Sequence, residues 1–104
     1  IGFAMFVEKS GLGPFDDVTP FLFFIRVPAD LRDPLRASLK EQGIDTGLHW
    51  RPAHRHTYFQ QFRQGPLPVC DAAGDELISL PLHSSPMSDD TIDRVCDAIV
   101  TALR

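Results

Sequence analysis

Residues 21–27 read Phe-Leu-Phe-Phe-Ile-Arg-Val, an aromatic and β-branched run enclosed by Pro20 and Pro28. Such a run predicts a β-strand, because bulky and branched side chains pack well on a pleated surface. The run is almost continuously apolar, which is typical of a strand that is buried on both faces. The rest of the fold is therefore expected to assemble around this segment.

A helix is predicted to follow the strand, over Pro34–Gln42. Asp33 is a favourable N-cap residue, and it directly precedes Pro34, which is favoured at the first helical position. Leu35 and Leu39 are one helical turn apart and share one face. We expect this face to cover the strand.

The remaining segments alternate between strand and helix patterns. Strands are expected over 44–50 and 78–82, and helical turns over 57–63 and 68–76. A terminal helix is expected after Ser88, a good N-cap followed by two aspartates at the positive end of the helix dipole. This order predicts an α+β fold: a small antiparallel or mixed sheet of about three strands, covered mainly on one face by helices.

The length of 104 residues suits one domain. Residues 1–19 combine an apolar start with a glycine- and proline-rich connector, so the domain is expected to cover 20–104. The sequence does not begin with methionine, and we expect it to start partway through a longer product.

The acidic balance argues against two classes of partner. The net charge is −4 and the pI is near 5.4, so no bulk affinity for nucleic acid or an acidic membrane surface is expected. No apolar run reaches the roughly 18–20 residues of a membrane span. Cys70 and Cys96 lack metal-type spacing and lie in apolar stretches, so they are expected to be two buried free thiols of a cytosolic protein.

The most informative stretch for function is residues 49–56, His-Trp-Arg-Pro-Ala-His-Arg-His, at the end of a predicted strand. One interpretation is anion recognition, in which Arg51 binds a carboxylate or phosphate and Trp50 supplies an apolar wall. A second is a metal site at His49, His54 and His56, although no cysteine or carboxylate in this stretch completes a tetrahedral set. The third is a solvated basic turn that contains one packed histidine.

Other candidate motifs are weaker. The serines at 79, 84 and 85 lie near His83, but no nucleophile-elbow glycines surround them. Gly11-Leu-Gly13 is too short for a phosphate loop. The acids at 71, 75 and 76 are typical of the solvated side of a helix, and Arg26 is expected to pair with a local carboxylate.

The stretch Gly43-Ile-Asp-Thr-Gly-Leu-His-Trp-Arg-Pro-Ala-His54 resembles the C-terminal small domain of the DegT/StrS family of pyridoxal-phosphate (PLP) sugar aminotransferases. Three further segments follow in the family's order: Leu67-Pro-Val69, Leu77-Ile-Ser-Leu-Pro-Leu82 and Met87-Ser-Asp-Asp90. The His-aromatic-Arg-x-Ala-His form is most similar to ArnB-type members, which aminate a UDP-4-keto-pentose with glutamate. The turn His83-Ser-Ser85 departs from the family's pattern.

The resemblance implies the small domain of a fold-type I aminotransferase that uses PLP and works as a homodimer in the cytoplasm. The lysine, acid and phosphate donors for PLP would come from a large domain outside this sequence, because the only lysines here are Lys9 and Lys40. The chain alone would then bind no cofactor, contain no catalytic residue and be inactive. The alternative is a non-catalytic binding or regulatory module of the same fold.

The resemblance also assigns substrate-binding roles to three residues. His49 would face the active-site cleft from the end of the second strand. Arg51 would bind a carboxylate, that of glutamate or 2-oxoglutarate or another substrate anion. His54 would orient the loop or contact the nucleotide sugar.

Overall fold

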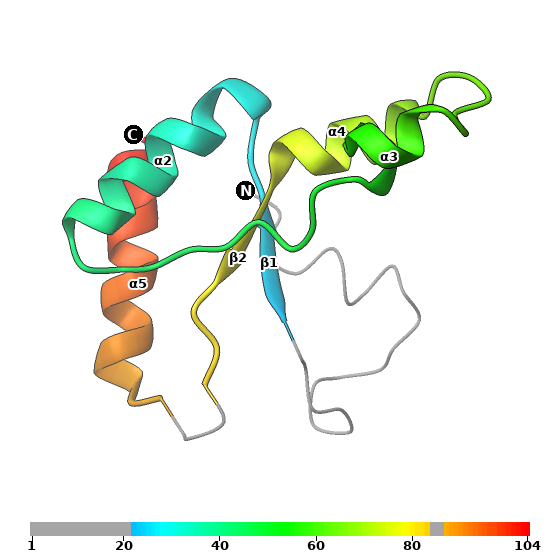
Figure 1. The fold of residues 1–104 in the computed structure, drawn as a ribbon. Coiled ribbons are helices and arrows are strands. Elements are labelled where there is room, and N and C mark those ends of the chain that lie inside the picture. The colour runs from blue at the N-terminus through cyan, green and yellow to red at the C-terminus, as the bar shows by residue number, and fades with distance from the viewer. Residues whose placement is uncertain (1–21, 84–86) are drawn as a thin grey trace, which may run out of the picture.

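The computed structural model describes residues 22–83 and 87–104, and it confirms the predicted α+β class (Figure 1). Two strands lie at the centre, β1 (Phe23–Arg26) and β2 (Leu77–Leu80). Helices α2 (Ala29–Glu41) and α5 (Asp89–Ala102) lie together on one side of them. The short 3-10 helix η2 (Ala53–Arg55), α3 (Thr57–Gln60) and α4 (Pro68–Glu76) project from the strands toward the other side.

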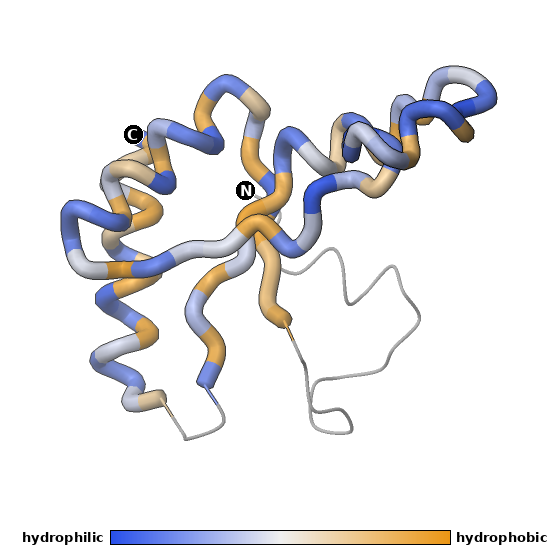
Figure 2. Tube along the Cα trace, viewed as in Figure 1, coloured by the Kyte–Doolittle hydropathy of each residue, from blue (hydrophilic) through white to orange (hydrophobic). Residues whose placement is uncertain are grey.

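The two strands pair antiparallel, with Phe23 opposite Leu80 and Ile25 opposite Ile78. Their inward side chains meet the apolar faces of α2 and α5. The fully buried side chains at this meeting point are Ile25, Leu39, Ile78 and Ile99. Figure 2 shows the apolar residues concentrated along the crossing strands, with hydrophilic positions on the outer turns of the helices. We call β1, β2, α2 and α5 the core layer.

The first strand is shorter and less enclosed than its composition predicts. Ile25 and Val27 are buried, but Arg26 between them is exposed and pairs with Glu76. The expectation of burial on both faces was wrong at Arg26, because the helices of residues 22–83 and 87–104 cover only one face of the sheet. The carboxylate partner expected for Arg26 is present, fifty residues away in sequence.

Helix α2 begins at Ala29, five residues before the predicted start, so Pro34 lies inside it. Proline removes one helical hydrogen bond and usually ends a helix. Here the early turns are held by tertiary contacts, since Arg32 donates a 2.5 Å hydrogen bond to the carbonyl of Gly74. Leu35 and Leu39 are both buried, as their spacing predicts.

The strand predicted over 44–50 is reduced to one bridge, in which Gly47 pairs with Ser79 of β2. The neighbouring Thr46 is held toward α2, since its hydroxyl accepts a hydrogen bond from Arg36 at 3.2 Å. The prediction of a third full strand was therefore wrong. This edge of the sheet instead carries the irregular segment 45–52, which leads to the predicted site.

The later helices follow the sequence closely. Helix α4 has the predicted bounds, and α3 is one turn within the predicted range 57–63. Ser88 caps α5 by accepting a hydrogen bond from the backbone N–H of Thr91 at 3.3 Å.

Both cysteines are free, but Cys70 is exposed and Cys96 is partly exposed, so the expected burial was wrong.

Segment 1–19 lies outside the described residues, and its boundary with the domain stays a prediction. Within the described residues, no helix is long and apolar enough to span a membrane.

Candidate functional site

Two of the three predicted site residues, His49 and Arg51, lie on the segment 45–52, which links the core layer to the projecting helices (Figure 1), and the third, His54, lies in η2. Gly47 anchors this segment to β2 by two backbone hydrogen bonds with Ser79, of 3.0 and 2.9 Å. The chain then continues through His49, Trp50 and Arg51 to Pro52, where η2 begins. We call η2, α3 and α4, with their connections (residues 53–76), the arm.

His49 is held by a side chain of the sheet rather than by its own loop. Its Nδ1 lies 2.9 Å from Oγ of Ser79, and Ser79 is only 3% exposed. The Trp50 ring meets the imidazole edge-on, with 5.5 Å between the ring centroids and 75° between their planes. Nε2 of His49 has no hydrogen-bond partner among the described residues. His49 is therefore oriented by Ser79 and Trp50 and is still exposed.

Arg51 and Trp50 lie at the surface. Trp50 is 70% exposed, and Arg51 uses one N–H group to donate a 3.1 Å hydrogen bond to the carbonyl of Arg55. Its other N–H groups have no partner in the described part of the chain. An arginine in this state is able to bind a carboxylate in a bidentate manner.

His54 has a different environment from the other two predicted residues. It is 9% exposed, and its Nε2 lies 2.7 Å from Oδ1 of Asp71 in α4. The imidazole thus joins η2 to α4. The structure places His54 inside the arm, whereas His49 and Arg51 lie on the segment that precedes it.

Arg55 extends the contact between η2 and α4. It donates to both carboxylate oxygens of Asp75, at 2.6 and 2.9 Å, and to Oδ1 of Asp71 at 3.0 Å. Hydrogen bonds from His54 and then Arg55 hold the pKa of Asp71 below its ordinary value of 3.8. The hydrogen bonds from Arg55 likewise lower the pKa of Asp75. We call His54, Arg55, Asp71 and Asp75 the polar clip.

A close apolar contact accompanies the polar clip. The Pro52 ring is buried against Gly74 of α4, where a Cβ atom would lie 2.4 Å from Pro52 Cγ. Only glycine at this position allows the segment to approach the helix so closely. Pro52 and Gly74 thus fix the direction in which the chain leaves the site.

The outer surface of the arm is rich in exposed apolar side chains. The Tyr58 ring contacts the rings of Phe59 and Phe62 edge-on, and all three side chains are exposed. Val69 on α4 is 84% exposed. Nothing else in the described residues covers this surface.

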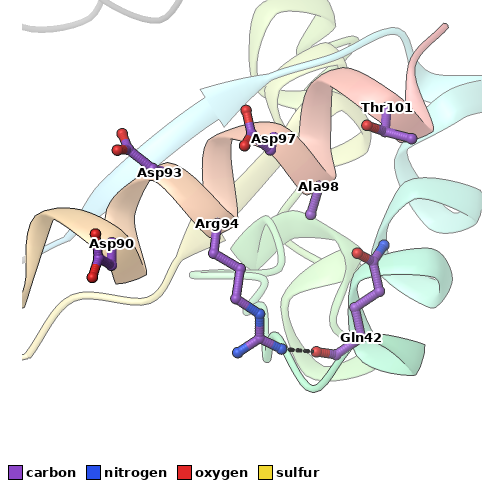
Figure 3. Close-up of a pocket in the computed structure, with 7 residues that line it drawn as sticks. All are labelled: Gln42, Asp90, Asp93, Arg94, Asp97, Ala98 and Thr101. Carbon is purple, nitrogen blue, oxygen red and sulfur yellow. Dashed lines mark hydrogen bonds between the residues drawn. The ribbon is translucent and has the colours of Figure 1, made fainter.

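An open hollow of about 430 Å³ lies elsewhere, between α5 and the end of α2 (Figure 3). Its lining includes the aspartates at 90, 93 and 97, and Arg94, which donates a hydrogen bond to the carbonyl of Gln42. None of the three predicted site residues lines this hollow. Asp93 and Asp97 point away from the Arg94 guanidinium, which is already engaged by the Gln42 carbonyl (Figure 3), so no function is assigned to the hollow.

The other interpretations can be compared with the geometry. In residues 22–83 and 87–104, no group of three histidine, cysteine or carboxylate side chains is arranged to hold a metal ion. Ser79 faces His49 and not the nearby His83. Sequence reasoning missed Ser79, Arg55, Asp71 and Asp75, because their partners are 16 to 30 residues away.

Residues 7–100 match the sequence profile of the DegT/DnrJ/EryC1/StrS aminotransferase family. The chain belongs to this family. The predicted family resemblance is thereby confirmed over most of the chain.

Solved structures of aminotransferases share the fold. The aminotransferase TlmJ from Streptoalloteichus hindustanus is 27% identical over 79% of this chain, with a TM-score of 0.71. The putative sugar aminotransferase Spr1654 from Streptococcus pneumoniae, solved in apo and PMP forms, is 24% identical over 78% of this chain, with a TM-score of 0.69. The matched region makes up 22% and 21% of those chains, so this sequence corresponds to about a fifth of their length.

The described residues do not fit the cofactor implied by the family. A PLP site needs an amine in a desolvated pocket and donors for the phosphate. Lys40 is exposed on α2, next to the exposed Glu41, and Lys9 lies outside the described residues.

Proposed function

We propose that this chain is the substrate-side domain of a PLP-dependent aminotransferase that acts on a nucleotide-linked keto sugar with glutamate as amino donor. In the whole enzyme, a large domain would hold PLP and supply the catalytic lysine, and two such polypeptides would form a cytoplasmic homodimer. The chain by itself would be inactive. Family membership and the fraction of the related structures that this chain matches support the proposal.

The observation that carries the site assignment is the contrast between Arg51 and Arg55. Arg55 makes three hydrogen bonds to two carboxylates and one to a backbone carbonyl, whereas Arg51 makes a single hydrogen bond and follows closely after the held His49. Arg51 would bind the carboxylate of glutamate or 2-oxoglutarate. His49 would direct Nε2 toward the same ligand or toward the sugar.

For His54, the buried contact with Asp71 supports the role of orienting the loop rather than touching the nucleotide sugar. Asp71 would keep the imidazole in place, and Pro52 would then set the path of the chain from Arg51 into the arm. Replacement of His54 is accordingly expected to affect both substrates alike.

The test is steady-state kinetics of the full-length enzyme with L-glutamate. Arg51→Ala should raise KM for glutamate roughly tenfold to a hundredfold, because a hydrogen bond to a charged group contributes about 1.5–3 kcal/mol. Arg94→Ala is the matched control, since this exposed arginine on α5 donates to the carbonyl of Gln42 and to none of the predicted site residues, and it should leave KM unchanged. An unchanged KM for Arg51→Ala would overturn the assignment.

The isolated chain separates the enzyme from the alternative of a free-standing module. It should show no turnover of L-glutamate with added PLP, and its activity should appear only with the large domain present. Turnover by the isolated chain would contradict the proposal. An upstream reading frame that encodes no large α/β domain would instead favour the non-catalytic module.

A further inference from the structure

Ser79 makes two different kinds of contact with the segment that carries His49. Its backbone exchanges hydrogen bonds with Gly47, and its buried hydroxyl contacts Nδ1 of His49. The backbone pair already attaches the segment to β2. The side-chain contact is therefore not needed to hold the loop, and its distinct effect is to fix the imidazole ring.

Gly47 contributes to the same arrangement through its missing side chain. A Cβ atom at this position would lie 2.3 Å from Cε1 and 2.7 Å from Nδ1 of His49. Both distances are far below van der Waals contact, so the ring lies directly on the Gly47 backbone. Any other residue at position 47 would push the ring away from Ser79.

We propose that Ser79 and Gly47 are positioning residues for His49: the serine hydroxyl holds Nδ1, the glycine gives the ring its place, and Nε2 is left for the ligand. This proposal rests on the proposed function, in which His49 contacts substrate. With Nδ1 engaged, Nε2 has a defined direction, and because the serine hydroxyl can donate or accept, the contact is compatible with either imidazole tautomer. The edge-on contact with Trp50 restricts the ring from a further side.

The first test is independent of any ligand and uses NMR spectra of the 15N-labelled chain at about pH 8, where an ordinary imidazole is neutral. A nuclear Overhauser effect should join His49 Hε1 to the Gly47 α-protons. Ser79→Ala should abolish it and should change the 15N shifts of both ring nitrogens of His49. Ser79→Thr, which keeps the hydroxyl, should restore the wild-type shifts.

Two controls separate ring orientation from general loss of structure. Ser38→Ala, a partly buried serine on α2, should leave the His49 signals unchanged. Gly47→Ala should displace the ring while the His54 signals keep their wild-type positions. Wild-type His49 shifts in Ser79→Ala, or a missing Overhauser effect in the wild type, would overturn the proposal.

The second test asks whether the orientation is used for binding. In the full-length enzyme, Ser79→Ala should raise KM for L-glutamate or for the nucleotide sugar roughly threefold to tenfold, as expected for loss of one neutral hydrogen bond. His49→Ala should have an equal or larger effect on the same substrate. If only His49→Ala alters KM, the positioning role is wrong while the proposed function stands. If neither variant alters KM, the substrate role of His49 fails even where the NMR result holds.

Discussion

The core layer and the arm are stabilised by different interactions. The core layer buries Ile25, Leu39, Ile78 and Ile99 completely and leaves few polar groups inside. The arm has no fully buried apolar side chain in α3 or α4, and it is held by the polar clip and by the contact between Pro52 and Gly74. Apolar burial stabilises the core layer, and this contribution does not depend on pH. Charged pairs stabilise the arm, so its stability depends on pH, and its apolar surface stays exposed.

This difference is informative about the site, because His49 and Arg51 lie on the segment between the two halves. One end of the segment is attached to β2 through Gly47, and the other end enters the arm through Pro52. The position of the site residues therefore depends on both kinds of interaction.

The largest expected effect is that of removing a core side chain. Leu39→Ala should lower the free energy of unfolding by about 2–5 kcal/mol, because it leaves a cavity between α2 and the sheet. Phe62→Ala on the exposed surface of the arm should change it by no more than about 0.5 kcal/mol. Urea denaturation followed by circular dichroism measures both.

If Leu39→Ala does not fold, Ile99→Val provides a milder version, with an expected loss of about 0.5–1.5 kcal/mol. An equal loss for Phe62→Ala and Ile99→Val would show that the arm surface is buried in solution. That result would contradict the contrast between the two halves.

Lowering the pH is expected to have an intermediate effect on stability, confined at first to the arm. The pKa values of Asp71 and Asp75 are lowered in the folded chain, so their ion pairs add stability that is present above the ordinary value of 3.8 and is lost as the pH falls below it. Amide spectra at successively lower pH should therefore show changes in the arm before the core layer.

Asp75→Asn should reduce this acid sensitivity and loosen the arm at neutral pH. Asp45→Asn, an exposed acid outside the polar clip, is the matched control and should behave like the wild type. Simultaneous loss of arm and core signals in acid would mean that the two halves unfold as one unit.

The smallest expected effect concerns the two cysteines. Cys70 on α4 is exposed, so Cys70→Ser should alter the free energy of unfolding by less than about 0.5 kcal/mol. A thiol reagent should modify Cys70 faster than the partly exposed Cys96 on α5. Equal labelling rates would indicate that Cys96 on α5 is as accessible to the reagent in solution as Cys70 on α4, which would contradict the difference in exposure between the two halves.

Local sequence patterns were sufficient for most of the secondary structure. The strand around Ile25, the bounds of α4 and the Ser88 cap of α5 follow from residue preferences within a few positions. Local rules were wrong for Pro34, which is inside α2 because contacts distant in sequence hold the first turns. They also predicted a strand at 44–50, where the backbone forms only one bridge, between Gly47 and Ser79. The side chains of Thr46 and His49 contact α2 and β2.

The sequence alone determined the α+β class, the apolar faces of its main helices and the residue types of the candidate site, since all of these depend on spacing along the chain. The tertiary structure decided which of the arginine and histidine side chains in this stretch have hydrogen-bond partners within the chain. It pairs Arg55 and His54 with Asp71 and leaves donors of Arg51 unused, and it brings Ser79 to His49 from 30 residues away. Contacts of this kind form only when the sheet and α4 pack against the loop, so they leave no periodic pattern in the sequence.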